Sequence, residues 1–147
     1  MTLLASPPPR AAELLVDLRE RTRDVARLLE KDLSVAALAS DEALRAGRGD
    51  CTAHALVLAE ALRRRGYETR LVTGYILEDG ALRRHRWNLV HVAGDWIPVD
   101  PMFGEVPASP SHLALAITGT AADELAFVDD VAFAGWDHAR AELVGGI

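Results

Sequence analysis

The run from Cys51 to Arg65, CTAHALVLAEALRRR, constrains the fold more than any other part of this sequence. Apolar residues occur on every side of a helix drawn through it, and a helix that is apolar all round is a buried one. Asp50 is a suitable N-cap, and Gly66, which follows three arginines, is a suitable C′ residue. The sequence therefore predicts a central helix that other elements cover.

The pattern changes to strands after this helix. Three β-rich segments are separated by short turns: residues 70–77, 85–92 and 96–99, with turns at Asp79-Gly80 and Ala93-Gly94-Asp95. Such spacing predicts an antiparallel β-meander, which we expect to pack against the buried helix. A loop rich in proline and glycine is expected over 100–111, and a further helix over 120–143.

The segment before the central helix predicts further helices. Apolar residues recur at helical spacing from Arg10 to about Lys31, as one amphipathic helix or as two that break near Thr22. Ser40 is expected to cap a short helix that runs into Leu44. We expect a flexible tail over residues 1–9 and a single domain over residues 10–147. The predicted fold class is α+β, with N-terminal helices and a buried central helix packed on an antiparallel β-meander.

Charge and composition exclude several classes of function. The 147 residues carry a formal net charge of −6, which argues against a nucleic-acid-binding surface. The local arginine clusters, Arg63–Arg65 and Arg83, Arg84 and Arg86, are expected to be solvated surface groups. We find no signal peptide, and no apolar run approaches the roughly 18 residues that span a membrane. The expectation is a soluble, cytoplasmic protein.

Cys51 is the first candidate for chemistry, and it is the only cysteine of the chain. It would occupy the first turn of the buried helix, where backbone N–H groups and the helix dipole stabilise a thiolate. The same N–H groups can hold the oxyanion that forms when a thiolate attacks a carbonyl. The position fits a small core residue equally well, because free cysteines are among the most buried residues.

His85 and Asp100 could complete a catalytic group with Cys51. His85 begins the second strand, on a mostly apolar strand face, where it could meet the start of the packed helix or lie at the surface as a strand-end residue. Asp100 ends the next strand, where a carboxylate can orient an imidazole. A tight turn centred on Gly94 would place Asp100 nearer to Asn88 or Leu89 than to His85, so the arrangement requires a bulge, a wider turn or a curl of the chain at Asp100-Pro101.

The other histidines are weaker candidates. Cys51-x-x-His54 puts two metal ligands on one helical face, and His85 or His91 could join them in a zinc site, but a single cysteine argues against a structural one. We expect a packing role for His54, and we place His91 too far along its strand to act as a base. The two remaining histidines are expected to be structural or surface groups: His112 and His138. We predict no metal and no cofactor.

Several of these segments together resemble the transglutaminase-like superfamily. Gly49-Asp50-Cys51 is similar to the step that opens that family's central helix, and Gly74-Tyr75 to the glycine-aromatic pair ending its next strand. His85-Arg86-Trp87 looks like the family's histidine-x-tryptophan, and residues 96–101 look like its tryptophan-x-x-x-aspartate-proline. Residues 110–116 resemble a segment that follows the aspartate in bacterial members. The resemblance covers residues 40–118.

The resemblance implies a papain-like or transglutaminase-like fold and cysteine-dependent acyl transfer. By it, Cys51 is the nucleophile, His85 the base and Asp100 the group that orients the base. It also makes Trp87 a candidate substrate-binding residue. A peptide or protein amide would form a thioester at Cys51, which water resolves in a protease and an amine resolves in a transglutaminase. We favour peptide hydrolysis.

Alternatives to this function stay open. Small members that the chain resembles include leader peptidases for ribosomal peptides such as lasso-peptide precursors, which would need a separate substrate-recognition protein. A catalytically silent transglutaminase-like binding module is the competing class. Leu89 stands where many relatives carry a glutamate. No tryptophan precedes Cys51 to serve as an oxyanion donor, so the second donor is unassigned.

Overall fold

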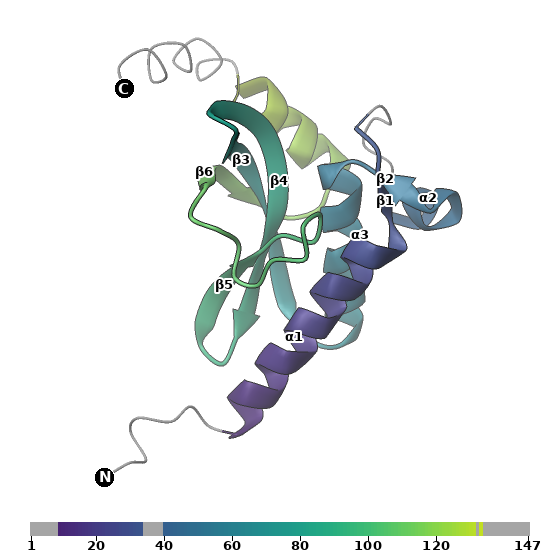
Figure 1. Ribbon diagram of the computed structural model, residues 1–147, viewed down its shortest axis with the longest axis vertical. Helices are drawn as coiled ribbons and strands as arrows, with labels where there is room; N and C mark the ends of the chain where they lie inside the picture. The colour runs from purple at the N-terminus through teal and green to yellow at the C-terminus, as the bar shows by residue number, and fades with distance from the viewer. Residues whose placement is uncertain (1–8, 34–39, 132, 134–147) are drawn as a thin grey trace.

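The central helix, α3 (Cys51–Arg64), lies between a long N-terminal helix and an antiparallel sheet in the computed structural model of the protein (Figure 1). The structure describes residues 9–33, 40–131 and 133. The other helices are α1 (Pro9–Leu28), α2 (Ser40–Ala46) and the helical residues 122–131. The predicted α+β fold, with N-terminal helices and a buried central helix, is confirmed.

α1 is one continuous helix. The hydroxyl of Thr22, where we considered a break, donates to the Leu18 carbonyl at 2.7 Å without interrupting the helix. Pro9, assigned to the tail, is instead the first residue of α1, where a missing N–H costs nothing. The tail predicted over residues 1–8 lies outside the described residues. Across the described ranges, no helix combines the length and apolarity that crossing a membrane requires.

The ends of α3 are fixed as its sequence predicts. Asp50 is the N-cap, and its Oδ1 accepts from the Ala53 N–H at 2.9 Å. Gly66 follows the C-cap residue with φ of +89°, a conformation that favours glycine. Gly49 lies under the first turn, where an added Cβ would be 2.4 Å from the Ala53 side chain. Close packing therefore explains the glycine that precedes Asp50.

The main sheet has four antiparallel strands in the order β5-β4-β3-β6. Their bounds are β3 (Glu68–Glu78), β4 (Ala81–Val92), β5 (Asp95–Val99) and β6 (His112–Thr118). The predicted meander corresponds to β3, β4 and β5. β6, which we did not predict as a strand, returns after the 100–111 loop and pairs with β3. Two short strands, β1 (Glu30–Lys31) and β2 (Arg48–Gly49), form a separate parallel pair.

β6 approaches β3 closely at Gly74. The register between the two strands shifts between Thr73 and Gly74, and an added Cβ on Gly74 would lie 2.0 Å from the Leu113 carbonyl oxygen. Only glycine leaves room for that carbonyl, which gives the Gly74-Tyr75 motif a physical reason. The same pairing sets the position of His112, at the start of β6.

The two faces of β4 meet different parts of the protein. Asn88 donates from Nδ2 to the Ala55 carbonyl of α3 at 2.9 Å, and Val90 packs in the core that α1 and α3 share. His85 and Trp87 alternate with these residues and stack on each other. The body of α3 therefore covers the Asn88 face of β4, whereas His85 meets only the start of the helix, at Cys51, which is one of the two positions considered for it.

Candidate active site

The β4–β5 register brings Asp100 to His85. The turn uses two residues, Ala93 and Gly94, with φ values of +50° and +90°, and it pairs Asn88 with Val99. One step further, Asp100 lies diagonally from His85 on the same face, a separation that long side chains can bridge. His85 Nε2 lies 2.6 Å from Asp100 Oδ2. The β4–β5 register has no bulge, so of the three features considered only the last is present: the chain curls back at Asp100, which pairs with Glu105 across the turn at 101–104.

Asp100 is fully buried and surrounded by donors. Its Oδ1 accepts from the Met102 N–H at 3.0 Å, and its Oδ2 accepts from both His85 and His112, at 2.6 and 2.7 Å. Burial raises the pKa of the Asp100 carboxyl, but the hydrogen bonds from His112 and His85 outweigh it and lower the pKa to about 2. Asp100 is therefore a carboxylate at neutral pH.

His85 lies between this carboxylate and Cys51. Because Nε2 donates to Asp100, Nδ1 is the ring nitrogen left for its hydrogen bond with Cys51. Burial lowers the pKa of His85, but the hydrogen bonds with Asp100 and Cys51 outweigh it and raise the pKa to about 9. The structure thus places a charged imidazolium beside the thiol, and it brings together the three residues that the sequence singled out.

Aromatic rings enclose the His85 imidazole. Its ring centroid lies 5.8 Å from Trp87, 5.7 Å from Phe103 and 5.6 Å from His112. Trp87 is 2 % exposed, a burial typical of a packing residue. Its predicted role in substrate binding stays a prediction. Phe103, which the sequence did not single out, is 39 % exposed beside the imidazole, with the Lys31 ammonium 4.7 Å from its ring centroid.

Cys51 is half-buried at the first position of α3. Together with His85 it lines a cavity of about 190 Å³, whose wall also includes residues of the sheet and of the C-terminal segment: Thr73, Arg84, Arg86, Asp129 and Phe133. Backbone N–H groups of the first helical turn point toward this end of the helix. The thiol therefore faces a small space in which a carbonyl carbon could meet it.

Arg86 is the largest departure from the expected surface charges. We predicted a solvated arginine, but Arg86 is 5 % exposed and all three guanidinium nitrogens donate hydrogen bonds. The acceptors are Thr73 at 2.9 Å, Thr52 at 2.9 Å and Asp129 at 2.6 Å. The prediction is wrong for Arg86 because these partners compensate for the burial of its charge.

His54 and His91 lie apart from this group. His54 is fully buried, with Nδ1 2.7 Å from the Asp50 carbonyl and Nε2 3.3 Å from the Leu29 carbonyl, which links α3 to the end of α1. The ring of His91 contacts Trp96 on β5, with 5.0 Å between centroids. The packing role expected for His54 agrees with these contacts, which also leave His54 poorly placed for a zinc site with Cys51.

His112 is the residue of this site that the sequence did not identify. We expected a structural or surface group, yet its side chain is 4 % exposed and its Nε2 contacts Asp100. Nδ1 faces Ser109, 2.9 Å from the carbonyl oxygen and 3.2 Å from the hydroxyl. The available signal was the apolar run after His112, which favours a strand. His138, the other such histidine, lies outside the described residues.

One cluster among the described residues could hold a metal ion. The possible ligand atoms of His85, Asp100 and His112 all lie within 4.8 Å of one another. In the observed arrangement both histidines donate to one carboxylate oxygen, so a metal ion would have to replace two hydrogen bonds. The hydrogen-bonded arrangement is complete by itself, and the absence of a metal remains our prediction.

Comparison with known proteins places these observations in a family. The model of the transglutaminase-like superfamily matches residues 11–101. A proposed cysteine protease from Cytophaga hutchinsonii has a similar structure, with a TM-score of 0.61 and 16 % identity over 82 % of this chain and 47 % of that chain. Calcium-bound LapG from Legionella pneumophila has a TM-score of 0.60 and 14 % identity, over 72 % of this chain and 65 % of that chain.

Both solved structures have low sequence identity to this chain. At such identities the two solved structures establish the fold alone, and this chain spans 47 % of the first structure's length and 65 % of the second's. No curated protein sequence matches the chain significantly. The papain-like or transglutaminase-like fold expected from the sequence is confirmed.

Proposed function

We propose, from the premise that this chain belongs to the transglutaminase-like superfamily, that it is a cysteine-dependent acyl-transfer enzyme that hydrolyses a peptide amide. One observation carries the proposal: the His85 imidazole is held between the Cys51 thiol and the ionised Asp100 carboxylate. In this reading Cys51 is the nucleophile, His85 the acid and base, and Asp100 the group that orients His85.

The reaction would proceed in two halves. The Cys51 thiolate attacks the amide carbonyl carbon, and backbone N–H groups at the start of α3 stabilise the oxyanion. The imidazolium of His85 then gives its proton to the leaving amine as the carbon–nitrogen bond breaks, which leaves a thioester. In the second half, His85 takes a proton from water as the water oxygen attacks the thioester carbonyl carbon. The carbon–sulfur bond then breaks, which releases the carboxylic acid and restores the Cys51 thiolate beside the His85 imidazolium.

Space beside the nucleophile favours water as the second substrate. The cavity that Cys51 lines has a volume of about 190 Å³, and during the second half the acyl group already occupies part of it. Water needs far less room than a lysine side chain. Amine transfer is the second candidate reaction, and the experiment below separates the two.

A simple ester tests the proposal without a known substrate. Wild-type protein should release p-nitrophenolate from p-nitrophenyl acetate and carry an acetyl group on Cys51, seen by intact mass. The Cys51→Ala variant should do neither. Added cadaverine should not accelerate release if water is the natural acceptor, whereas acceleration with formation of acetyl-cadaverine would identify a transferase. Release no faster than from Cys51→Ala would instead identify a silent binding module.

A further inference from the structure

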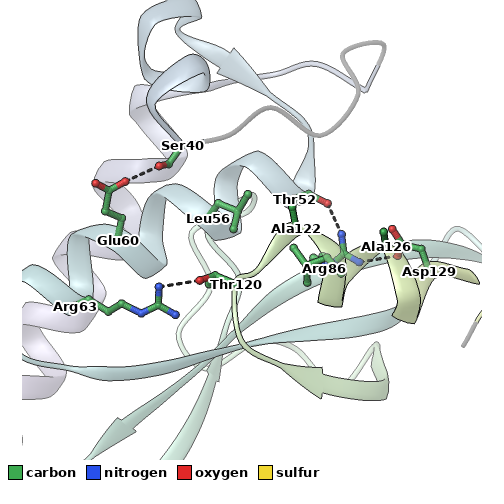
Figure 2. A pocket seen from close by; sticks show the side chains of 11 residues that line it. Ser40, Thr52, Leu56, Glu60, Arg63, Arg86, Thr120, Ala122, Ala126 and Asp129 are labelled. Atoms are coloured by element: carbon green, nitrogen blue, oxygen red, sulfur yellow. Dashed lines mark hydrogen bonds and ion pairs between the residues drawn. The ribbon is translucent and has the colours of Figure 1, made fainter. Parts of the chain in front are cut away.

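A second and larger cavity adjoins the one that Cys51 lines. It has a volume of about 480 Å³ and lies between α3 and the helical residues 122–131 (Figure 2). Three residues line both cavities: Thr52, Arg86 and Asp129. The hydrogen bonds from Arg86 to Thr52 and Asp129 therefore mark the place where the two spaces meet. None of the proposed catalytic residues lines the larger cavity.

The larger cavity is elongated along α3. The helix contributes Thr52, Leu56, Glu60 and Arg63, which follow one another at spacings of four, four and three residues and so share one face. Eleven residues of helix separate the first from the last, which corresponds to about 16 Å at the helical rise. Figure 2 shows the Arg86 contacts at one end and Glu60 and Arg63 toward the other. We call this cavity the α3 groove.

The ends of the α3 groove are polar and carry balanced charge. At the end near Cys51, Arg86 is paired with Asp129. Toward the other end, Arg63 donates to the Thr120 hydroxyl at 2.9 Å, and Glu60 accepts from the Ser40 hydroxyl at 2.5 Å. The two guanidinium groups are balanced by the two carboxylates, so the groove has no excess positive charge. A ligand that carries a phosphate would need such an excess.

The middle of the α3 groove is apolar. Leu56 is partly buried and packs against a buried cluster that includes Leu125, and small side chains complete the wall: Ala122 and Ala126. An apolar centre between hydrogen-bonding ends matches a peptide, which offers backbone amides at each residue and an apolar side chain at some of them. A long hydrocarbon chain could form no hydrogen bond with the polar side chains at the two ends, whereas a peptide backbone can.

We infer that the α3 groove binds the acyl side of an extended peptide substrate, with an apolar side chain seated between Leu56 and residues 122–126. Leu56 lies five residues beyond Cys51, about 7.5 Å along the helix, which equals about two residues of extended chain. The apolar side chain should therefore belong to the residue two positions before the one that acylates Cys51. This inference rests on the proposed function, because it takes Cys51 as the nucleophile.

Chloromethyl ketones that alkylate Cys51 give a direct test. The reagents are acetyl-leucyl-alanyl-glycyl chloromethyl ketone and its analogue with alanine in place of leucine, acetyl-alanyl-alanyl-glycyl chloromethyl ketone, with iodoacetamide as a small reference. The leucyl reagent should react about tenfold or more faster than the alanyl one, the gain expected for burying the larger side chain. The Ala126→Trp variant, which fills the groove from an exposed helical position, should remove that gain and keep the iodoacetamide rate.

A matched control is Ala61→Trp. Ala61 lines a different cavity, of about 350 Å³, that α1 and α2 bound on another side of α3. This variant should keep the preference for the leucyl reagent. Equal rates for the two peptide reagents on wild-type protein, or a preference that survives Ala126→Trp, would overturn the inference, as would an equal loss in Ala61→Trp.

A binding measurement separates this inference from the proposed function. Acetyl-leucyl-alanyl-glycine amide is titrated into the Cys51→Ala variant, and NMR follows the methyl signals of Leu56 and Leu125. Saturable shifts that disappear when Ala126→Trp is added support the groove even if Cys51 proves unreactive. If Cys51 is reactive but neither these shifts nor the leucyl preference is observed, the proposed function stands and the inference about the α3 groove is wrong.

Discussion

His112 donates from Nε2 to Asp100 Oδ2 at 2.7 Å, the same oxygen that accepts from the His85 ring. Because Asp100 is ionised, both Nε2 atoms must carry a proton. Ser109 can serve either protonation state of His112, since its hydroxyl can donate to Nδ1 and its carbonyl can accept from it. His112 therefore competes with His85 for one carboxylate oxygen, and this competition weakens the hydrogen bond between His85 and Asp100.

The first prediction concerns His112→Leu. Removing the competing donor should leave Asp100 Oδ2 a stronger acceptor for His85, so the pKa of His85 should rise above that of the wild type. The readout is NMR titration of the His85 ring, assigned with a His85→Gln variant. His112→Gln supplies an amide donor and should shift the His85 pKa less.

The direction of that shift distinguishes two roles of His112. If His112 only holds the Asp100 side chain in place, its loss should let the carboxylate move away and should lower the pKa of His85. A lower value in His112→Leu than in the wild type would thus assign His112 a structural role. Either way, the loss of one donor to a buried carboxylate should cost about 1–3 kcal/mol of stability, which a urea melt measures.

The second prediction concerns stability and pH. The pKa of His85 rises from 6.5 to about 9 on folding, so the folded protein binds more protons than the unfolded chain between these values. The stability that His85 contributes is therefore fully present below pH 6.5 and is lost as pH rises through about 9. Urea unfolding from pH 6 to pH 10 should show a steeper loss for wild type than for His85→Gln. Parallel curves would contradict the raised pKa.

The third prediction separates the two histidines of β4. His85→Gln should slow alkylation of Cys51 by iodoacetamide at pH 7 by about tenfold or more, because the thiolate loses its cationic partner. With a substrate that the enzyme turns over, kcat of His85→Gln should fall by about 10²-fold, the usual scale for the loss of a general base. His91→Gln should change either rate by less than about tenfold, since His91 packs on Trp96. The reverse ranking would show that the base is misassigned.

Local patterns predicted much of this fold and brought three site residues to attention. The central helix could be predicted because its caps and its all-round apolar surface lie within one segment. The diagonal between His85 and Asp100 depended on whether the β4–β5 turn centres on Gly94 or on the Ala93–Gly94 pair. That difference of half a residue shifts the partner of Asn88 by one position, which a sequence pattern rarely fixes.

Long-range pairing explains what the sequence left unpredicted. His112 reaches Asp100 only because the chain passes from β5, at one edge of the sheet, to β6, at the other edge, where β6 pairs with β3 and Gly74 makes room for it. Arg86 was assigned to the surface because arginines usually lie there, and its acceptors Thr52 and Asp129 come from segments far away in the chain. Neither contact leaves a periodic signal in the local sequence.

The last prediction concerns Asp50, which caps the helix that presents Cys51. Its Oδ1 accepts from the Ala53 N–H at 2.9 Å, a bond that an asparagine oxygen can also accept. Asp50→Ala should therefore cost about 1 kcal/mol of stability, whereas Asp50→Asn should stay close to wild type. Thermal melts of both variants, with the iodoacetamide rate of Cys51, provide the test. Equal loss of stability in the two variants would mean that the cap contributes little and that charge at position 50 matters instead. If Asp50→Ala also slows alkylation while Asp50→Asn does not, the cap fixes the first turn on which the reactivity of Cys51 depends.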